Sequence, residues 1–158
     1  MAFTALDVKN LREKTGVGMM ECKKALTEAD GDMDRAFEIL RERGLAASEK
    51  KASRIAAEGA IIAYTDEDAK VTVLLEINSE TDFVAKNDQF RTFVSEVCDQ
   101  VMDTTAADID AFMEEAWKAD ASKTVKDVLQ DQIAVIGENM NIRRFTTVEE
   151  PNGFIAAY

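Results

Sequence analysis

The chain has 158 residues, which is enough for one ordinary domain, or for a small module plus a larger one. Its hydrophobic content of 46% can supply a core, which excludes disorder as the default. Its 19 basic and 31 acidic side chains give a net charge of −12, which is uneven: residues 1–54 carry +1 and residues 55–158 carry −13. The acidic part would repel nucleic acid and anionic membranes, so a protein partner with a basic or apolar surface fits better.

Cysteine content and targeting signals bound the setting of the protein. Cys22 and Cys98 lie far apart and form no CxxC pair, which argues against a structural zinc site and for a reduced, intracellular protein. No apolar stretch reaches transmembrane length, and the first residues lack the pattern of a signal or transit peptide. The sequence therefore predicts a cytoplasmic protein, with no cofactor and no membrane or nucleic-acid contact.

Residues 1–54 predict a three-helix domain with a linker. Thr4 and Asp7, three residues apart, indicate a capping box at the start of the first helix. Glycines and aspartates separate the helices, and Gly44 is expected to end the third one at its C′ position. The expected helices span 4–15, 19–29 and 33–43, followed by a linker with partial helical character over 45–57.

Residues 55–140 predict an α+β core subdomain, and residues 141–158 the start of a second one. Apolar periodicity gives strands over 59–64 and 70–77 around a turn at 65–69, helices over 88–102, 107–117 and 125–139, and a third strand over 141–148. A fourth strand is expected from Phe154 onward. Because the sequence stops at Tyr158 inside this apolar segment, an edge that complete domains cover, we expect a truncated part of a longer protein.

Catalytic chemistry has little support in the sequence. The absence of histidine removes Ser–His and Cys–His dyads and every histidine-based metal site. Gly16-Val17-Gly18 resembles the start of a dinucleotide fingerprint, but Glu21 stands where the third glycine belongs and no strand precedes it. The many carboxylate pairs are expected on solvated helix faces. These absences disfavour an enzyme.

Met19 and Met20 follow the glycine loop and form the first candidate contact surface. Consecutive helical residues point about 100° apart, so one core stripe cannot hold both side chains. One methionine is then exposed for adaptable protein contact, or both pack locally across the tight helix-turn-helix. Arg12, one turn before the loop, either flanks the same surface or is an ordinary solvated arginine.

The second candidate is the polar corner that follows the apolar run 71–77. Either Thr81 or Asp82 caps the next helix while Phe83 fills the local core, or Phe83 is held out for a partner. The helix that starts near Asn87 already has its own apolar face, which favours an exposed Phe83. Arg143 and Arg144 on the third strand should point to opposite faces and are mainly structural.

Three segments together carry a family resemblance: residues 11–26 (LREKTGVGMMECKKAL), 81–87 (TDFVAKN) and 136–144 (IGENMNIRR). In order and spacing they resemble the signatures of bacterial elongation factor Ts, and the resemblance covers the whole chain. It implies a ubiquitin-associated-like helical domain, then an α+β core with an antiparallel sheet. It also implies guanine-nucleotide exchange on elongation factor Tu, a GTPase bound in its GDP-bound and nucleotide-free states.

The resemblance also assigns roles to residues. The segment Thr81–Val84 is implied to contact elongation factor Tu and to dislocate its Mg²⁺, with Phe83 as the wedge and Asp82 in support. Arg12, Met19 and Met20 are implied to grip another part of the GTPase domain. Two alternatives stay open: a helical module that binds a ubiquitin-like or nascent-chain partner without exchange, and a small acidic enzyme.

Overall fold

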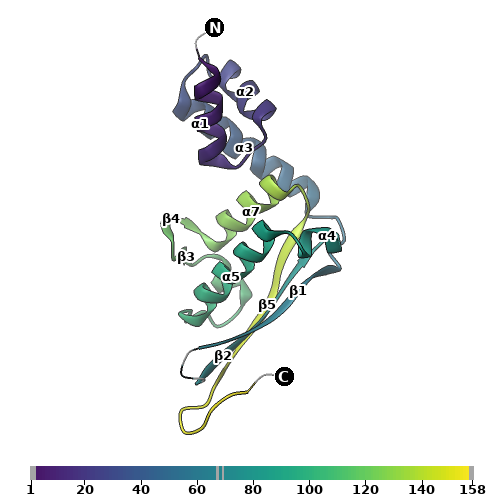
Figure 1. The fold of residues 1–158 in the computed structure, drawn as a ribbon, viewed down its shortest axis with the longest axis vertical. Coiled ribbons are helices and arrows are strands. Elements are labelled where there is room, and N and C mark those ends of the chain that lie inside the picture. Colours follow the sequence, from purple (N-terminus) through teal and green to yellow (C-terminus); the bar gives the residue numbers. More distant parts are fainter. Residues whose placement is uncertain (1–2, 67, 69, 157–158) are drawn as a thin grey trace. The chain divides into compact units, whose positions relative to one another are not determined.

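The computed structural model describes residues 3–66, 68 and 70–156. They combine N-terminal helices with a core that contains an antiparallel sheet, which confirms the predicted α+β class (Figure 1). Two compact units can be distinguished. One consists of residues 3–53 with 130–137, and the other of residues 54–129 with 138–156.

The first unit is built on the helices α1 (Ala5–Thr15), α2 (Met19–Glu28) and α3 (Met33–Lys51). The predicted capping box is present, because the Thr4 side chain accepts from the Asp7 amide and the Asp7 carboxylate accepts from the Thr4 amide. One apolar cluster holds the helices together: Val8, Leu11, Cys22, Ala25, Leu26, Ala36, Ile39 and Leu40.

The predicted end of the third helix is wrong, since α3 runs through Gly44 to Lys51. A Cβ atom on Gly44 would lie 3.2 Å from the Ala134 methyl group in the C-terminal part of α7 (Val125–Ile136). Both residues belong to the first unit. Gly44 therefore allows α7 to pack closely against α3, whereas the sequence pattern had indicated only a glycine that ends a helix.

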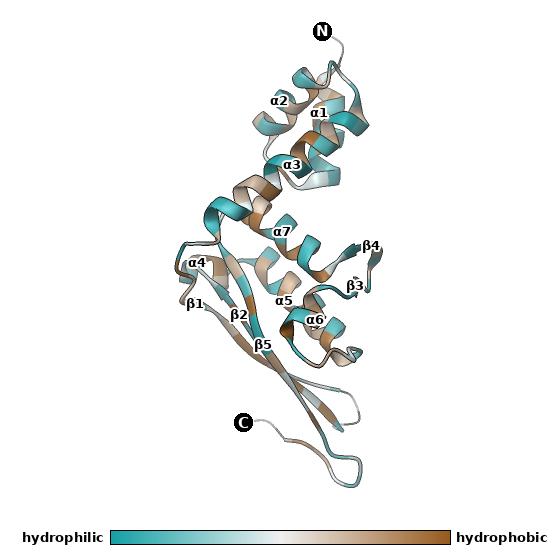
Figure 2. Ribbon diagram, turned by 180° about the vertical axis from the view of Figure 1, so that it is seen from behind, coloured by the Kyte–Doolittle hydropathy of each residue, from teal (hydrophilic) through white to brown (hydrophobic). Residues whose placement is uncertain are grey.

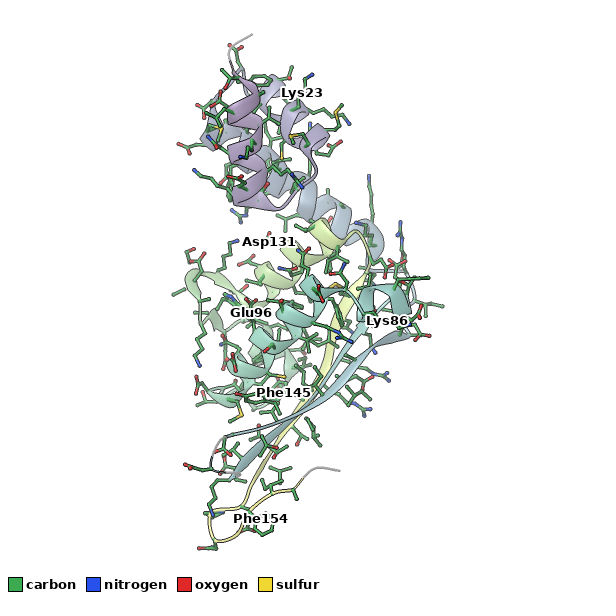
Figure 3. All side chains as sticks on the ribbon, viewed as in Figure 1. Lys23, Lys86, Glu96, Asp131, Phe145 and Phe154 are labelled. Atoms are coloured by element: carbon green, nitrogen blue, oxygen red, sulfur yellow. The ribbon has the colours of Figure 1, made fainter. Side chains whose placement is uncertain are left out.

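The second unit centres on the strands β1 (Glu58–Thr65), β2 (Val71–Ser79) and β5 (Met140–Glu149), which form an antiparallel sheet in the order β1-β2-β5. Alternate β2 residues, Val73, Leu75 and Ile77, are buried together with the apolar face of α5 (Asp88–Met102). Figure 2 shows the resulting mixture of apolar and polar residues along the strands. On β5, Phe145 contacts Phe112, with ring centroids 4.9 Å apart (Figure 3).

The region 107–124 differs from the prediction. Helix α6 spans only Ile109–Met113, and the strands β3 (Ala116–Trp117) and β4 (Asp120–Thr124) follow it as a two-stranded sheet. Trp117 lies in β3 and not in the predicted helix, and its buried ring stacks on Phe93, with ring centroids 6.5 Å apart. This long-range contact decides the local structure.

Three further boundaries need comment. Helix α7 ends at Ile136 instead of residue 139, and Gly137 follows it with a positive φ of 89°. Residues 154–156 are not a strand, so the expected fourth strand is wrong where the structure describes it. The predicted turn at 65–69 lies partly outside the described residues, which omit 67 and 69.

Candidate functional site

Among the described residues, the most exposed aromatic side chain, that of Phe83, lies at the corner that follows β2. A short helix, α4 (Asp82–Ala85), stands between β2 and α5 and was not predicted. The side chain of Asn87 then caps α5 by accepting from the amides of Gln89 and Phe90, at 2.8 and 3.4 Å. We call residues 79–86 the β2–α4 corner.

Phe83 is 80% exposed, whereas its neighbour Val84 is 8% exposed. Neighbouring residues of a helix point about 100° apart, so one turn buries Val84 and turns Phe83 outward. The prediction that Phe83 is held out of the core is confirmed. Burying such a side chain is worth about 1.5–3 kcal/mol, and the free chain forgoes this stabilisation.

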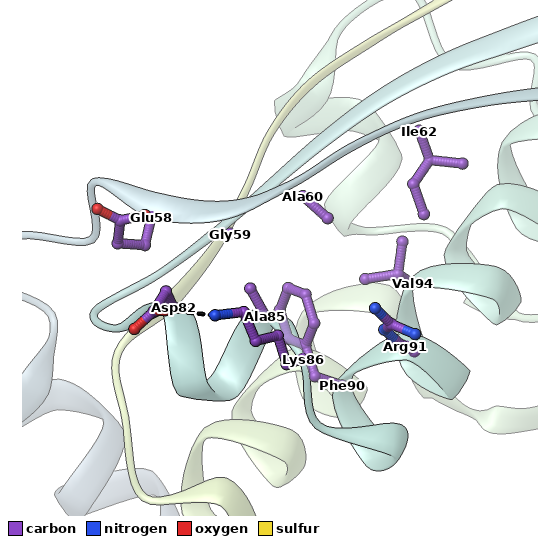
Figure 4. Close-up of a pocket in the computed structure, with 10 residues that line it drawn as sticks. All are labelled: Glu58, Gly59, Ala60, Ile62, Asp82, Ala85, Lys86, Phe90, Arg91 and Val94. Carbon is purple, nitrogen blue, oxygen red and sulfur yellow. Dashed lines mark hydrogen bonds and ion pairs between the residues drawn. The ribbon is translucent and has the colours of Figure 1, made fainter.

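Thr81 stands at the N-cap position of α4, but its side chain makes no cap hydrogen bond there, and the longer helix α5 is capped by Asn87. The Asp82 carboxylate instead accepts from Lys86 Nζ at 2.6 Å (Figure 4). This hydrogen bond, followed by the charge of Lys86, lowers the pKa of Asp82. Asp82 is therefore a carboxylate that braces α4 along its surface.

Thr81 is held by Glu138, a residue that lies 57 positions later in the sequence. Its amide donates to Glu138 Oε2 at 3.0 Å, and its hydroxyl donates to Glu138 Oε1 at 2.7 Å. The sequence reasoning missed Glu138 as a site residue. It lies within the third signature segment, but a contact across 57 residues has no local signal.

Asn139 holds the corner through a second set of hydrogen bonds, next to those of Glu138; we call the two sets the ties of the corner. The Asn139 amide donates to Glu80 Oε1 at 2.6 Å, and the Asn139 side chain donates to the Arg54 carbonyl at 2.8 Å. Ser79, which is fully buried, donates from its hydroxyl to the Thr81 carbonyl at 3.0 Å. Two adjacent residues of the corner are thus bound to two adjacent residues before β5, which holds the corner in one geometry.

The N-terminal candidates lie in the first unit. Met19 is 46% exposed and Met20 is 65% exposed, so both methionines face solvent where only one was expected to. Gly16, with a φ of 68°, ends α1 and donates its amide to the Arg12 carbonyl at 2.8 Å. The Arg12 side chain is exposed. These residues and the β2–α4 corner belong to different units and form two separate candidate surfaces.

The expectation that Arg143 and Arg144 diverge is wrong. Arg143 Nη1 lies 3.1 Å from Glu76 Oε1, and Arg144 Nε lies 2.7 Å from Glu76 Oε2. The register between β2 and β5 shifts at Glu76/Ile77, where Arg144 pairs with Glu76 and Ile142 with Ile77. Arg143 is the extra residue of a β-bulge, so both arginines reach one carboxylate.

Both cysteines of the chain are free and buried. Burial raises the pKa of the Cys98 thiol to about 11, and it also raises that of Cys22, so neither is a ready thiolate. Within the described residues, no group of three or more His, Cys, Asp or Glu side chains is placed to hold a metal ion. No helix in that part of the chain is long and apolar enough to cross a membrane.

Comparison with known proteins points to one family. Residues 80–158, which begin at the β2–α4 corner, match the family model described as Elongation factor TS. The elongation factor Ts of Trichlorobacter lovleyi is 51% identical over 158 residues, which is all of this chain and 51% of that protein. That of Halothermothrix orenii is 48% identical over 158 residues and 52% of its length.

A third relative, the elongation factor Ts of Clostridium novyi, is 52% identical over 155 residues, which is 98% of this chain and 51% of that protein. The chain spans about half the length of the curated relatives it matches. These matches place it among proteins that are named elongation factors. More particularly, the chain belongs to the elongation factor Ts family.

Proposed function

We propose that this chain acts in translation elongation as part of a guanine-nucleotide exchange factor for elongation factor Tu, the GTPase that delivers aminoacyl-tRNA. The observation that carries the proposal is Phe83, which is 80% exposed on a corner held by Glu138 and Asn139. A large apolar side chain on a fixed corner suits insertion into a partner. Membership of the elongation factor Ts family supports elongation factor Tu as the partner that receives this side chain.

The exchange would work through binding alone, without covalent chemistry. Phe83 and its neighbours need only bind the nucleotide-free GTPase better than the GDP-bound form. By linkage, the chain then weakens GDP binding by the same factor by which GDP weakens binding of the chain. We assign Phe83 as the wedge that disturbs the Mg²⁺ and nucleotide site, with Thr81, Asp82 and Val84 holding it in place.

The first unit would provide a second grip on the same GTPase. Met19 and Met20 expose flexible, polarisable side chains, which adapt to a partner surface. Arg12 would add charge beside them. Met20→Asp should therefore weaken the complex while leaving the stability of the chain within about 0.5 kcal/mol, because the side chain is mostly exposed.

The test is the release of fluorescently labelled GDP from elongation factor Tu, with and without this chain. We expect acceleration that Phe83→Ala abolishes while the melting temperature stays unchanged. Phe154→Ala is the matched control, since Phe154 is 76% exposed and lies away from the corner in the sequence. Loss of acceleration in the Phe154 variant alone, or an unfolded Phe83 variant, would refute the wedge.

A binding module without exchange is the second candidate, and the exposure of both methionines favours it. It predicts that Met20→Asp abolishes binding to a ubiquitin-like protein and that Phe83→Ala has no effect on any function. The full chain should be used for this test. Residues 130–137 pack in the first unit, where Gly16 and Gly44 approach Val135 and Ala134, so a fragment of residues 1–54 would lack that support.

A further inference from the structure

A groove of about 600 Å³ lies beside the β2–α4 corner, between the edge strand β1 and the helices α4 and α5 (Figure 4). Ala60 and Ile62 line it from the strand. Phe90 and Val94 of α5 close its floor, and both are almost fully buried. The groove therefore has an apolar floor and runs along β1, a strand at the edge of the sheet.

The strand that borders the groove has one free edge. Among the described strands β1 pairs only with β2, so alternate N–H and C=O groups of β1 point away from the sheet. Gly59, which also lines the groove, carries no side chain, and a Cβ atom there would lie 2.1 Å from the Ile77 carbonyl oxygen of the paired strand β2. An open edge beside an apolar groove is the arrangement that binds an extended peptide as an added strand.

Charge defines what kind of peptide fits. Glu58 and Arg91 line opposite ends of the groove, as Figure 4 shows, and neither side chain has a charged partner among the described residues. Lys86 also lines the groove, but the Asp82 carboxylate already neutralises it. The groove thus presents one free negative end and one free positive end.

We propose that this groove binds an extended segment of another protein that adds to β1 as an antiparallel strand. Glu58, Ala60 and Ile62 alternate along β1 and so share one face of the sheet. Four strand residues span about 14 Å, which sets the charges of the ligand about four residues apart. Antiparallel pairing then places an acidic residue first, at Arg91, an apolar residue in the middle, and a basic residue last, at Glu58.

This binding mode goes beyond exchange and does not depend on it, because the added strand uses the edge of β1 and not the Phe83 side chain. The probe is the capped peptide Thr-Glu-Thr-Val-Thr-Lys-Thr, whose Glu, Val and Lys side chains fall on one face of a strand. Its partner probe has Glu and Lys exchanged. Binding is followed by chemical shifts of the ¹⁵N-labelled 158-residue chain.

We expect saturable shifts at the amides of β1 and α5, with weaker binding of the exchanged peptide. Arg91→Glu should lower the affinity about fivefold, the effect of turning one exposed ion pair into a repulsion. Replacing the Glu of the peptide by Lys should restore the affinity for this variant. Lys126→Glu, an exposed cation that pairs with Glu114 elsewhere, and Phe83→Ala should both bind like the parent chain.

Three results would overturn the proposal: no saturable shift at millimolar peptide, shifts centred away from β1 and α5, or equal affinity of the Arg91→Glu variant for the original peptide. Loss of peptide binding in Phe83→Ala would also overturn it, because the ligand would then occupy the wedge surface. Exchange activity can fail while peptide binding persists, so the two proposals are tested separately.

Discussion

Glu138 should control how rigidly the chain presents Phe83. Its carboxylate accepts two hydrogen bonds from Thr81, one from the amide and one from the hydroxyl. Glu138→Ala removes both acceptors and leaves the two donors to water. Because no other side chain bonds the Thr81 amide in the structure as described, the β2–α4 corner should loosen and Phe83 with it.

The size of the effect follows from these two bonds. A hydrogen bond to a charged group contributes about 1.5–3 kcal/mol, and less where water replaces the lost partner. Glu138 and Thr81 are only partly buried, so water replaces part of each lost bond, and Glu138→Ala should cost about 1 kcal/mol per bond, or about 2 kcal/mol in total. Glu138→Gln keeps one acceptor without its charge and should cost about 1 kcal/mol.

Urea unfolding followed by the fluorescence of Trp117 measures this cost. Trp117 is the single tryptophan and is buried in the second unit, so it reports on the unit that contains the corner. Hydrogen exchange at residues 81–86 measures the loosening directly. The control is Glu96→Ala, an exposed carboxylate on α5 (Figure 3), which should stay within about 0.5 kcal/mol. Unchanged exchange rates and stability in Glu138→Ala would refute the role of this tie.

Two further variants test the sheet. The hydrogen bond from Arg144 holds the pKa of Glu76 below its ordinary value. The ionised Glu76 side chain therefore stabilises the fold fully at a pH above the ordinary glutamate pKa. This stabilisation is lost as the pH falls through the lowered pKa of the folded state. Thermal melts should therefore show a flatter acid limb for Glu76→Gln, and an unchanged limb would contradict this account. Gly59→Ala should cost about 3 kcal/mol or more in urea, because φ is 128° and the new Cβ meets the Ile77 carbonyl. Glu58→Ala is the neighbouring control, and similar stability of the two variants would exclude this explanation.

Local signals predicted much of the fold. The capping box at Thr4, the break at Gly16 and the cap at Asn87 are encoded within a few residues, so α1, α2 and α5 follow from the sequence. Contacts between distant segments explain the errors. The close approach of Ala134 favours a glycine at position 44 inside a helix, and stacking on Phe93 places Trp117 in a strand instead of the predicted helix. Neither partner can be identified from the neighbouring sequence.

The site divides in the same way. Exposure of Phe83 was predictable, because the following helix already carried enough apolar residues for its own face. The hydrogen bonds from Thr81 to Glu138 and from Asn139 to Glu80 were not, since they connect residues that lie 57 and 59 positions apart in the sequence. The bulge that brings Arg143 and Arg144 to Glu76 breaks the alternation on which strand predictions rest.

These ties give the exposed side chain of Phe83 a physical purpose. Binding a partner through a flexible loop loses the freedom of each ordered residue, whereas a corner fixed before binding has lost it on folding. Burial of Val84 sets the rotation of α4 and thereby the direction of Phe83. The hydrogen bonds to Glu138 and Asn139 then hold Thr81 and Glu80, the two adjacent residues that lead into α4. Loosening these ties should therefore weaken partner binding even where Phe83 itself is unchanged, so Glu138→Ala and Phe83→Ala should impair one and the same step.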